Sequence, residues 1–149
     1  MNNNSKELRS RKIRVQSSGG VVYRRNLDSI DIVGCVRNDP YVCVLPKGTP
    51  QKKETIHETA LREVSEETGL KVQIERFIDK IDYTFFKKEK EGIYYKTVYF
   101  FLMAAVGGEF FLHDAEFDSV KWVMGGQIRA EMSYENEVRI IEKGISMVG

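Results

Sequence analysis

Apolar and polar residues divide the chain into short runs typical of β-strands, with two helical stretches between them. Runs rich in β-branched and aromatic residues occupy 15–23, 30–36, 41–45, 93–106 and 120–124, and another lies within 71–84. Turn-forming or charged residues separate them at 26–29, 37–40 and 87–92. The run 93–106 is the longest, and we expect a central strand that ends at the glycine pair after it.

A first helix is predicted over 56–68. Thr55 and Glu58 have the spacing of a capping box at its start, and Gly69 stands where a left-handed residue commonly ends a helix. The loop before it, Pro46-Lys47-Gly48, directly follows a predicted strand.

A second helix is predicted over 133–143, with Tyr134, Val138 and Ile141 on one side and Gly144 as its end. Strands with two helices among them imply an α/β chain whose mixed β-sheet is covered on both faces. We expect a flexible basic arm over 1–12 and a single domain over 13–149.

The composition is that of an ordinary globular protein. The chain has 149 residues, 42% hydrophobic residues and a net charge of +1. This charge offers no polycationic field, so we expect no nucleic-acid partner. The start of the chain has no apolar stretch, and its longest apolar run is too short to cross a bilayer, so we expect a cytoplasmic protein without a membrane partner. Cys35 and Cys43 lie in separate apolar runs and are expected to be buried free thiols.

The acids of the first helix are placed unusually. Ile56, Ala60, Leu61 and Val64 form its apolar stripe, while Glu63 and Glu67 fall beside or within that stripe and Glu66 lies just outside it. Carboxylates crowded near a core repel one another and need cations, and magnesium fits such oxygen ligands. An ordinary charged surface helix explains the glutamates but not their position.

The stretch 46–70 resembles the Nudix family of nucleoside-diphosphate-linked-moiety hydrolases. The family pattern is Gly-x5-Glu-x7-Arg-Glu-apolar-x-Glu-Glu-x-Gly-apolar, and the chain matches it throughout with Gly48, Glu54, Arg62, Glu63, Val64, Glu66, Glu67, Gly69 and Leu70. The resemblance implies an α/β/α sandwich with a mixed β-sheet, the Nudix fold. It also implies hydrolysis of a phosphoanhydride with bound metal ions.

The resemblance assigns metal ligands within this stretch. It implies Glu63 and Glu67 as the first magnesium ligands, Glu66 as the ligand that shares a second ion, and the backbone carbonyl of Lys47 or Gly48 as a further ligand. Mn²⁺ is expected to substitute for Mg²⁺.

Two other residues of the pattern are expected to support the ligands. Arg62 is expected to orient the glutamates, and its spacing allows it to pair with Glu58 or Glu66. Glu54 either ties the loop to the helix or joins the metal site, and we favour the first role.

The base that deprotonates the water is sought outside this stretch as well. Segment 113–118 resembles the acidic loop that precedes a tryptophan strand in many relatives, which makes Glu116 the leading candidate and Glu63 its competitor. A solvated acidic loop explains the same residues. His57 and His113 are expected to be packing or surface residues.

Three features bear on the substrate. Segment 45–48 resembles the form seen in hydrolases of dinucleoside polyphosphates and of diphosphoinositol polyphosphates, and Lys47, Lys52 and Lys53 suit a run of phosphates. Segment 96–102 resembles a strand that presents an aromatic ring to a base. The residues implied for substrate binding are, besides these lysines, Phe100 and Tyr83 for stacking and Arg37 and Lys96 for outer phosphates. Core packing explains the aromatic residues equally well.

The sequence therefore predicts a magnesium-dependent pyrophosphohydrolase of nucleotide polyphosphates, with dinucleoside polyphosphates such as diadenosine tetraphosphate preferred. Diphosphoinositol polyphosphates and nucleoside triphosphates are alternative substrates. A catalytically silent module that senses a nucleotide is a different class, usually marked by lost glutamates, and none is lost here. A homodimer is left open, and one departure stands out: Lys53 occupies a position where many relatives have glycine.

Overall fold

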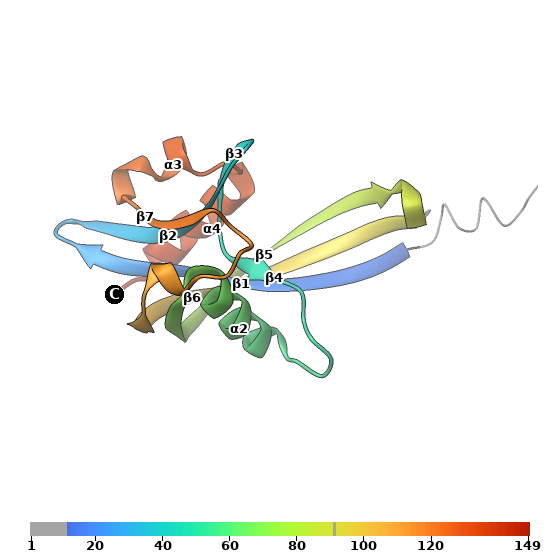
Figure 1. The fold of residues 1–149 in the computed structure, drawn as a ribbon, viewed down its shortest axis with the longest axis horizontal. Coiled ribbons are helices and arrows are strands. Elements are labelled where there is room, and N and C mark those ends of the chain that lie inside the picture. The colour runs from blue at the N-terminus through green and yellow to red at the C-terminus, as the bar shows by residue number, and fades with distance from the viewer. Residues whose placement is uncertain (1–11, 91) are drawn as a thin grey trace, which may run out of the picture.

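The fold is built on one seven-stranded mixed sheet with helices on both faces (Figure 1). The computed structural model describes residues 12–90 and 92–149. The strands are β1 (Lys12–Asn26), β2 (Ser29–Asn38), β3 (Tyr41–Val44), β4 (Lys47–Gly48), β5 (Leu70–Lys87), β6 (Gly92–Gly108) and β7 (Ser119–Val123). Their order is β3-β2-β1-β6-β5, with β4 paired to β1 and β7 paired to β2.

Two hydrophobic clusters lie on opposite faces of this sheet. Ala60 and Val64 of α2 (Ile56–Thr68) pack on Phe101 and its neighbours on one face. On the other face, α4 (Glu135–Ser146) packs against a cluster that contains Phe100. The alternation of Phe100 and Phe101 between clusters is the two-residue period of a central strand. The expected α/β/α sandwich is confirmed.

The first helix follows its sequence signals. It covers Ile56–Thr68, Thr55 and Glu58 form both hydrogen bonds of the capping box, and Gly69 ends it with φ 77°. The two cysteines also follow expectation, because both are buried free thiols. Burial is the main cause that raises the pKa of each of these thiols.

The end predicted for the C-terminal helix is wrong. Gly144 lies inside α4, which continues to Ser146. A Cβ at Gly144 would lie 2.8 Å from Cδ1 of Ile78, so the glycine allows α4 to approach the sheet closely. The structure also contains α3 (Ile128–Glu131) and three short 3₁₀ helices, Lys88–Lys90, Phe110–Leu112 and Gly125–Gln127, which were not predicted as such.

Three strands are longer than predicted and continue beyond the helical layers. β1 pairs with β6 in parallel from Lys12 onward, and β5 pairs with β6 as far as Lys87. These segments form a three-stranded arm that leaves the body of the molecule (Figure 1). Lys12 therefore begins a strand, and the rest of the basic arm predicted over 1–12 lies outside the described residues. No helix in the described part of the chain is long and apolar enough to span a membrane.

Candidate active site

The lysine–glycine loop lies directly against the first strand. Lys47 and Gly48 form β4 and pair with Gly19 and Ser18 of β1. A Cβ at Gly19 would lie 2.1 Å from the carbonyl oxygen of Pro46, so only a glycine allows this approach. The first strand thereby holds the loop beside α2.

Glu67 is the buried acid of the site. Its exposed fraction is 5%, and one carboxylate oxygen accepts a hydrogen bond from the backbone N–H of Lys47 at 3.0 Å. Burial foremost, together with the nearby charges of Glu63, Glu116 and Asp114, raises the pKa of Glu67 to about 8 against the opposing effect of that hydrogen bond. A cation beside Glu67 would favour its ionised form.

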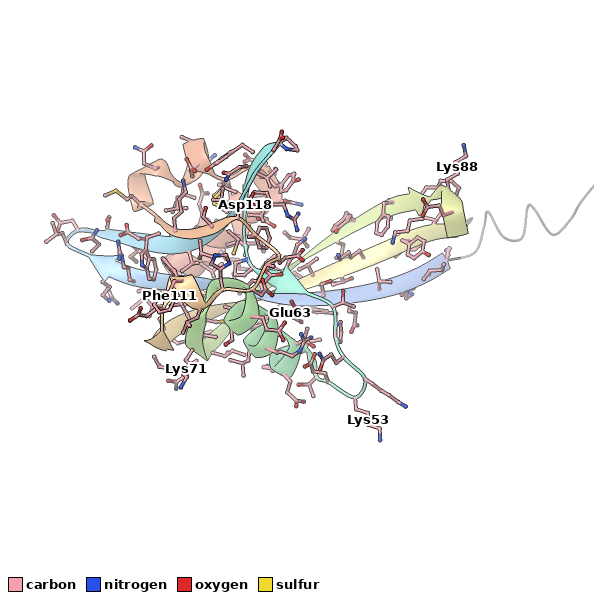
Figure 2. All side chains as sticks on the ribbon, viewed as in Figure 1. Lys53, Glu63, Lys71, Lys88, Phe111 and Asp118 are labelled. Carbon is pink, nitrogen blue, oxygen red and sulfur yellow. The ribbon has the colours of Figure 1, made fainter. Side chains whose placement is uncertain are left out.

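Glu63 lies against the same loop. A Cβ at Gly48 would come within 2.1 Å of the Glu63 carboxyl carbon, so the carboxylate occupies the space that a side chain at this position would fill. Figure 2 shows Glu63 beside the junction of α2 and β4. Glu63 and Glu67 therefore both reach the backbone at 47–48, one turn of helix apart.

Arg62 binds several of the surrounding oxygens. It donates hydrogen bonds to Glu54 at 2.7 and 2.9 Å, to Glu63 at 2.8 Å, to Glu66 at 3.3 Å and to the Thr49 carbonyl at 2.9 Å. These contacts fix the side chains of two acids on α2 relative to the loop. This is the orienting geometry expected of Arg62.

Of the two pairings that the spacing of Arg62 allows, the structure shows the one with Glu66, while Glu54 takes the place of Glu58. Glu58 instead accepts the backbone N–H of Thr55 in the capping box, which satisfies an otherwise unpaired donor at the helix start. Glu54 also accepts from the backbone of Gln51, and Arg62 foremost lowers its pKa to about 2. Glu54 therefore ties the loop to the helix.

The oxygen donors at this site fit a divalent cation in their chemistry. Glu67 is buried with a raised pKa, and Glu63 is set against loop backbone whose carbonyls are further oxygen donors. No group of three Asp, Glu, His or Cys side chains in residues 12–90 and 92–149 stands ready to hold an ion. Glu63 is instead held by Arg62, and Glu67 by the Lys47 N–H.

The acidic loop after β6 reaches the same region. Glu116 and Glu67 line a cavity of about 260 Å³ together with Lys47. Arg37 donates to Glu116 at 2.6 Å, and its guanidinium lies over the Phe117 ring at 4.6 Å. The structure therefore brings Glu116 to the site and places Arg37 on Glu116. Asp118, labelled in Figure 2, instead accepts the backbone N–H of Asn38 at 2.7 Å.

A larger cavity, of about 470 Å³, opens toward the α4 side of the sheet. Its lining contains the predicted Lys47, Tyr83 and Phe100, together with Ile81, Val98, Tyr134, Asn136 and Glu137. Tyr83 is 38% exposed, whereas Phe100 has no exposed surface. Phe100 is therefore a core residue that forms part of the cavity wall, and its ring has no open face for stacking. Lys47 lines both cavities, which therefore lie next to each other.

Sequence reasoning missed three polar residues of the larger cavity: Tyr134, Asn136 and Glu137. Glu137 is 3% exposed and accepts the backbone N–H of Leu45 at 2.9 Å, while burial raises its pKa. The available signal was an acid directly beside the apolar residue Val138 in the predicted helix. Glu67 was singled out because it lies beside the apolar stripe of its helix, and the same reasoning applies to Glu137.

The remaining predicted residues do not line either of these cavities. Lys52 is exposed in the turn before α2. Lys53 points outward from that loop (Figure 2) and has φ 68°, a conformation that glycine adopts without strain. Lys96 is partly buried on β6, opposite Tyr83 in the sheet register. His57 packs its ring against Phe101, with 4.6 Å between the centroids.

Comparison with known proteins decides the family. The NUDIX domain description matches residues 19–143. The chain belongs to the Nudix family. It is also 33% identical over 144 residues to the MutT4 protein of Mycobacterium tuberculosis, a match that covers 90% of this chain and 56% of MutT4. The chain therefore spans little more than half the length of that relative.

Solved Nudix structures share the fold. A NUDIX hydrolase from Nitrosomonas europaea superposes with a TM-score of 0.66 and 20% identity, covering 89% of both chains. An Ap4A hydrolase of C. elegans, as a binary complex, gives 0.67 and 18%, covering 89% of this chain and 96% of the other. The NUDIX domain of Shewanella oneidensis NrtR, complexed with ADP ribose, gives 0.67 and 15%, covering 98% of both.

Family membership confirms the Nudix resemblance on which the prediction from sequence rests. Hydrolases of this family act on phosphoanhydride bonds and generally use a divalent metal ion. Because these solved structures are less than 25% identical to the chain, they establish the fold only.

Proposed function

We propose that this Nudix protein is a magnesium-dependent pyrophosphohydrolase of nucleotide polyphosphates, with dinucleoside polyphosphates such as diadenosine tetraphosphate as the preferred class. The observation that carries the proposal is the pair Glu63 and Glu67 against the loop at Gly48. Glu67 is almost fully buried with a raised pKa, and Glu63 touches the glycine itself. Buried Glu67 is costly to keep ionised unless a cation joins it.

The residues proposed to hold the cation are Glu63, Glu67 and the backbone carbonyl of Lys47 or Gly48, with Glu66 sharing a second ion. Mn²⁺ is expected to replace Mg²⁺ there. A bound divalent ion neutralises charge on phosphate oxygens and lowers the pKa of a bound water. Arg62 forms an ion pair with Glu63 at 2.8 Å. On cation binding we expect Arg62 to retain Glu54, its bidentate partner, and so to keep the loop in place.

We assign the two parts of the substrate to different cavities. Lys47 lines both cavities, and we assign its ammonium to phosphate oxygens. The volume of the larger cavity lies within the range of small-ligand sites, and Tyr83 offers an exposed ring for a base. We place the nucleoside in the larger cavity and the phosphates at the smaller one.

Glu116 is the proposed general base. It lines the phosphate-side cavity with Glu67, and the ion pair with Arg37 fixes its direction. In the reaction, water attacks one phosphorus in line, the bond to the leaving phosphate breaks, and the carboxylate takes the proton of the water. Glu63 is the competing base. Its contact with Arg62 must loosen before it can act.

A second candidate substrate class is the nucleoside triphosphates. The relative MutT4 has a mutator-protein name, whereas the Ap4A hydrolase of C. elegans supports the dinucleoside class through its fold only. Diphosphoinositol polyphosphates remain a third class. A silent nucleotide sensor is disfavoured, because every glutamate of the family pattern is present.

A substrate panel tests the proposal. Release of nucleotide and phosphate is measured with diadenosine tetraphosphate, nucleoside triphosphates and a diphosphoinositol polyphosphate, with Mg²⁺ and with EDTA. We expect magnesium-dependent turnover that is fastest with the dinucleoside. Glu67→Gln is expected to abolish turnover in a folded protein, whereas Glu142→Gln, on the exposed side of α4, keeps it. Nucleotide binding without turnover of any substrate would show a sensor instead.

A further inference from the structure

One face of the protruding arm carries aromatic rings and lysines together. Tyr83, Phe85 and Lys87 alternate along β5, and Tyr94 and Lys96 lie opposite them on β6. We call these five residues the aromatic–lysine face. They share one side of the sheet, because residues two apart on a strand point the same way and register partners lie side by side.

The aromatic–lysine face continues into the larger cavity. Ile81 and Val98 are the next register pair on this side of the sheet, and both line the cavity with Tyr83. A ligand in the cavity therefore has a path outward along the arm. Figure 1 shows that the arm leaves the region that α4 covers.

The rings on this face are arranged for stacking. Phe85 and Tyr94 are stacked, with centroids 5.0 Å apart and planes at 14°, and the Phe85 and Tyr83 centroids are 6.0 Å apart. Lys87 lies over the Phe85 and Tyr94 rings, with its ammonium 5.8 and 5.4 Å from their centroids. Because Tyr83 is 38% exposed, a planar group can reach its ring.

The lysines on this face lack acidic partners among the described residues. Neither Lys87 nor Lys96 forms an ion pair with a described carboxylate, although Lys96 is partly buried. Burial lowers the pKa of Lys96, and the charge of Lys87 lowers it further. The nearby Asp82 accepts from Thr97 and pairs with Lys80 on the other side of the sheet. The aromatic–lysine face therefore presents two ammonium groups that form no ion pair with a carboxylate of the described residues.

We propose that the aromatic–lysine face binds single-stranded nucleic acid, with phosphates at Lys87 and Lys96 and bases on Tyr83 and Phe85. Aromatic platforms beside cations are the means by which proteins hold single strands without reading a sequence. A second copy of the chain is a poorer occupant, because a two-fold contact through this face brings the lysines of both copies together. This proposal departs from the expectation of no nucleic-acid partner, which rested on the net charge of +1. That number sums the charges of the arm and of the acidic region at α2, so it does not describe the charge of this face.

Binding is tested without hydrolysis, in EDTA, so that the result does not depend on the enzymatic proposal. Fluorescence anisotropy is measured with a short 3′-labelled single-stranded RNA against the wild type and the double variant Lys87→Ala/Lys96→Ala. We expect binding that weakens with salt, and a log–log salt slope that falls by about 1.4 in the double variant, at about 0.7 for each lost phosphate contact. Lys71→Ala removes a lysine from the opposite end of the molecule (Figure 2) and serves as the matched control, with wild-type binding.

Stacking is tested separately with Tyr83→Ala and Phe85→Leu. Each is expected to weaken binding roughly 10-fold, as loss of one base–aromatic contact does, with the salt slope unchanged. Circular dichroism confirms that each variant is folded. Absence of RNA binding by the wild type, or equal binding by the lysine double variant, would overturn the proposal. So would a stable dimer in light scattering that dissociates in Phe85→Leu, because that result assigns the face to a second copy.

Discussion

The raised pKa of Glu67 predicts a stability that changes with pH in a definite direction. A carboxyl group with a pKa of 4.5 in the unfolded chain and about 8 in the fold binds its proton more tightly when folded. The contribution of the Glu67 carboxyl group to the free energy of unfolding is fully present below about pH 4.5. It is lost progressively as the pH rises toward about 8. At about 1.4 kcal/mol per pKa unit, the loss between pH 5.5 and pH 8 is about 3 kcal/mol.

Glu67→Gln removes this titration and keeps the hydrogen bond, because the amide oxygen can accept the Lys47 N–H. Urea unfolding in EDTA at about pH 5.5 and about pH 8 measures the difference. We expect Glu67→Gln to gain about 3 kcal/mol relative to the wild type between these two conditions. Glu66→Gln, whose side chain is 48% exposed, is the control and shows no comparable gain.

At about pH 8, where Glu67→Gln is expected to be more stable than the wild type in EDTA, magnesium should make the wild type the more stable of the two. A cation that binds the folded wild type stabilises it by mass action, and Glu67→Gln loses that gain. A free-energy difference between Glu67→Gln and wild type that does not change with pH in EDTA would refute the assignment of Glu67 as a buried acid of raised pKa.

Four further predictions concern other residues of the loop, the core and the candidate site. Gly48→Ala places a Cβ 2.1 Å from the Glu63 carboxyl carbon, so we expect a loss of turnover on the order of 100-fold with little change in melting temperature, and wild-type turnover would contradict the contact. Phe100→Ala should lower the free energy of unfolding by about 4 kcal/mol, because the ring is fully buried. Tyr83→Ala should raise KM for the nucleotide while leaving the unfolding free energy almost unchanged; unchanged KM would remove Tyr83 from the nucleoside site. Arg62→Lys keeps the charge but loses the fork that holds Glu54 and Glu63 together, so we expect kcat to fall, and full activity in this variant would exclude an orienting role.

Local signals were sufficient for α2 and the loop before it. The capping box at Thr55 and Glu58 and the left-handed Gly69 act within one turn of the chain, so the sequence contains both partners of each contact. The positions of Glu63 and Glu67 beside the apolar stripe likewise follow from helical geometry. The family pattern in this stretch added the chemistry of a phosphoanhydride hydrolase.

Contacts between distant segments could not be read in the same way. Glu137 reaches the backbone of Leu45, and Arg37 pairs with Glu116, only because the sheet brings these segments together. Gly144 was mistaken for a helix end because a glycine inside a helix needs a tertiary reason, which Ile78 supplies. The ends of β1 and β5 were missed since polar residues there become strand by pairing with β6.

The sequence by itself determined that this chain has an acid-bearing helix behind a glycine loop and belongs to a family that hydrolyses phosphoanhydrides. These properties depend on residues within about 25 positions of one another, and short-range geometry is encoded locally. Only the tertiary structure decided which acids are buried, which lysines lack a described acidic partner, and which of Tyr83 and Phe100 offers an open ring. Burial and charge pairing depend on what other strands and helices place nearby, and no local pattern contains that information.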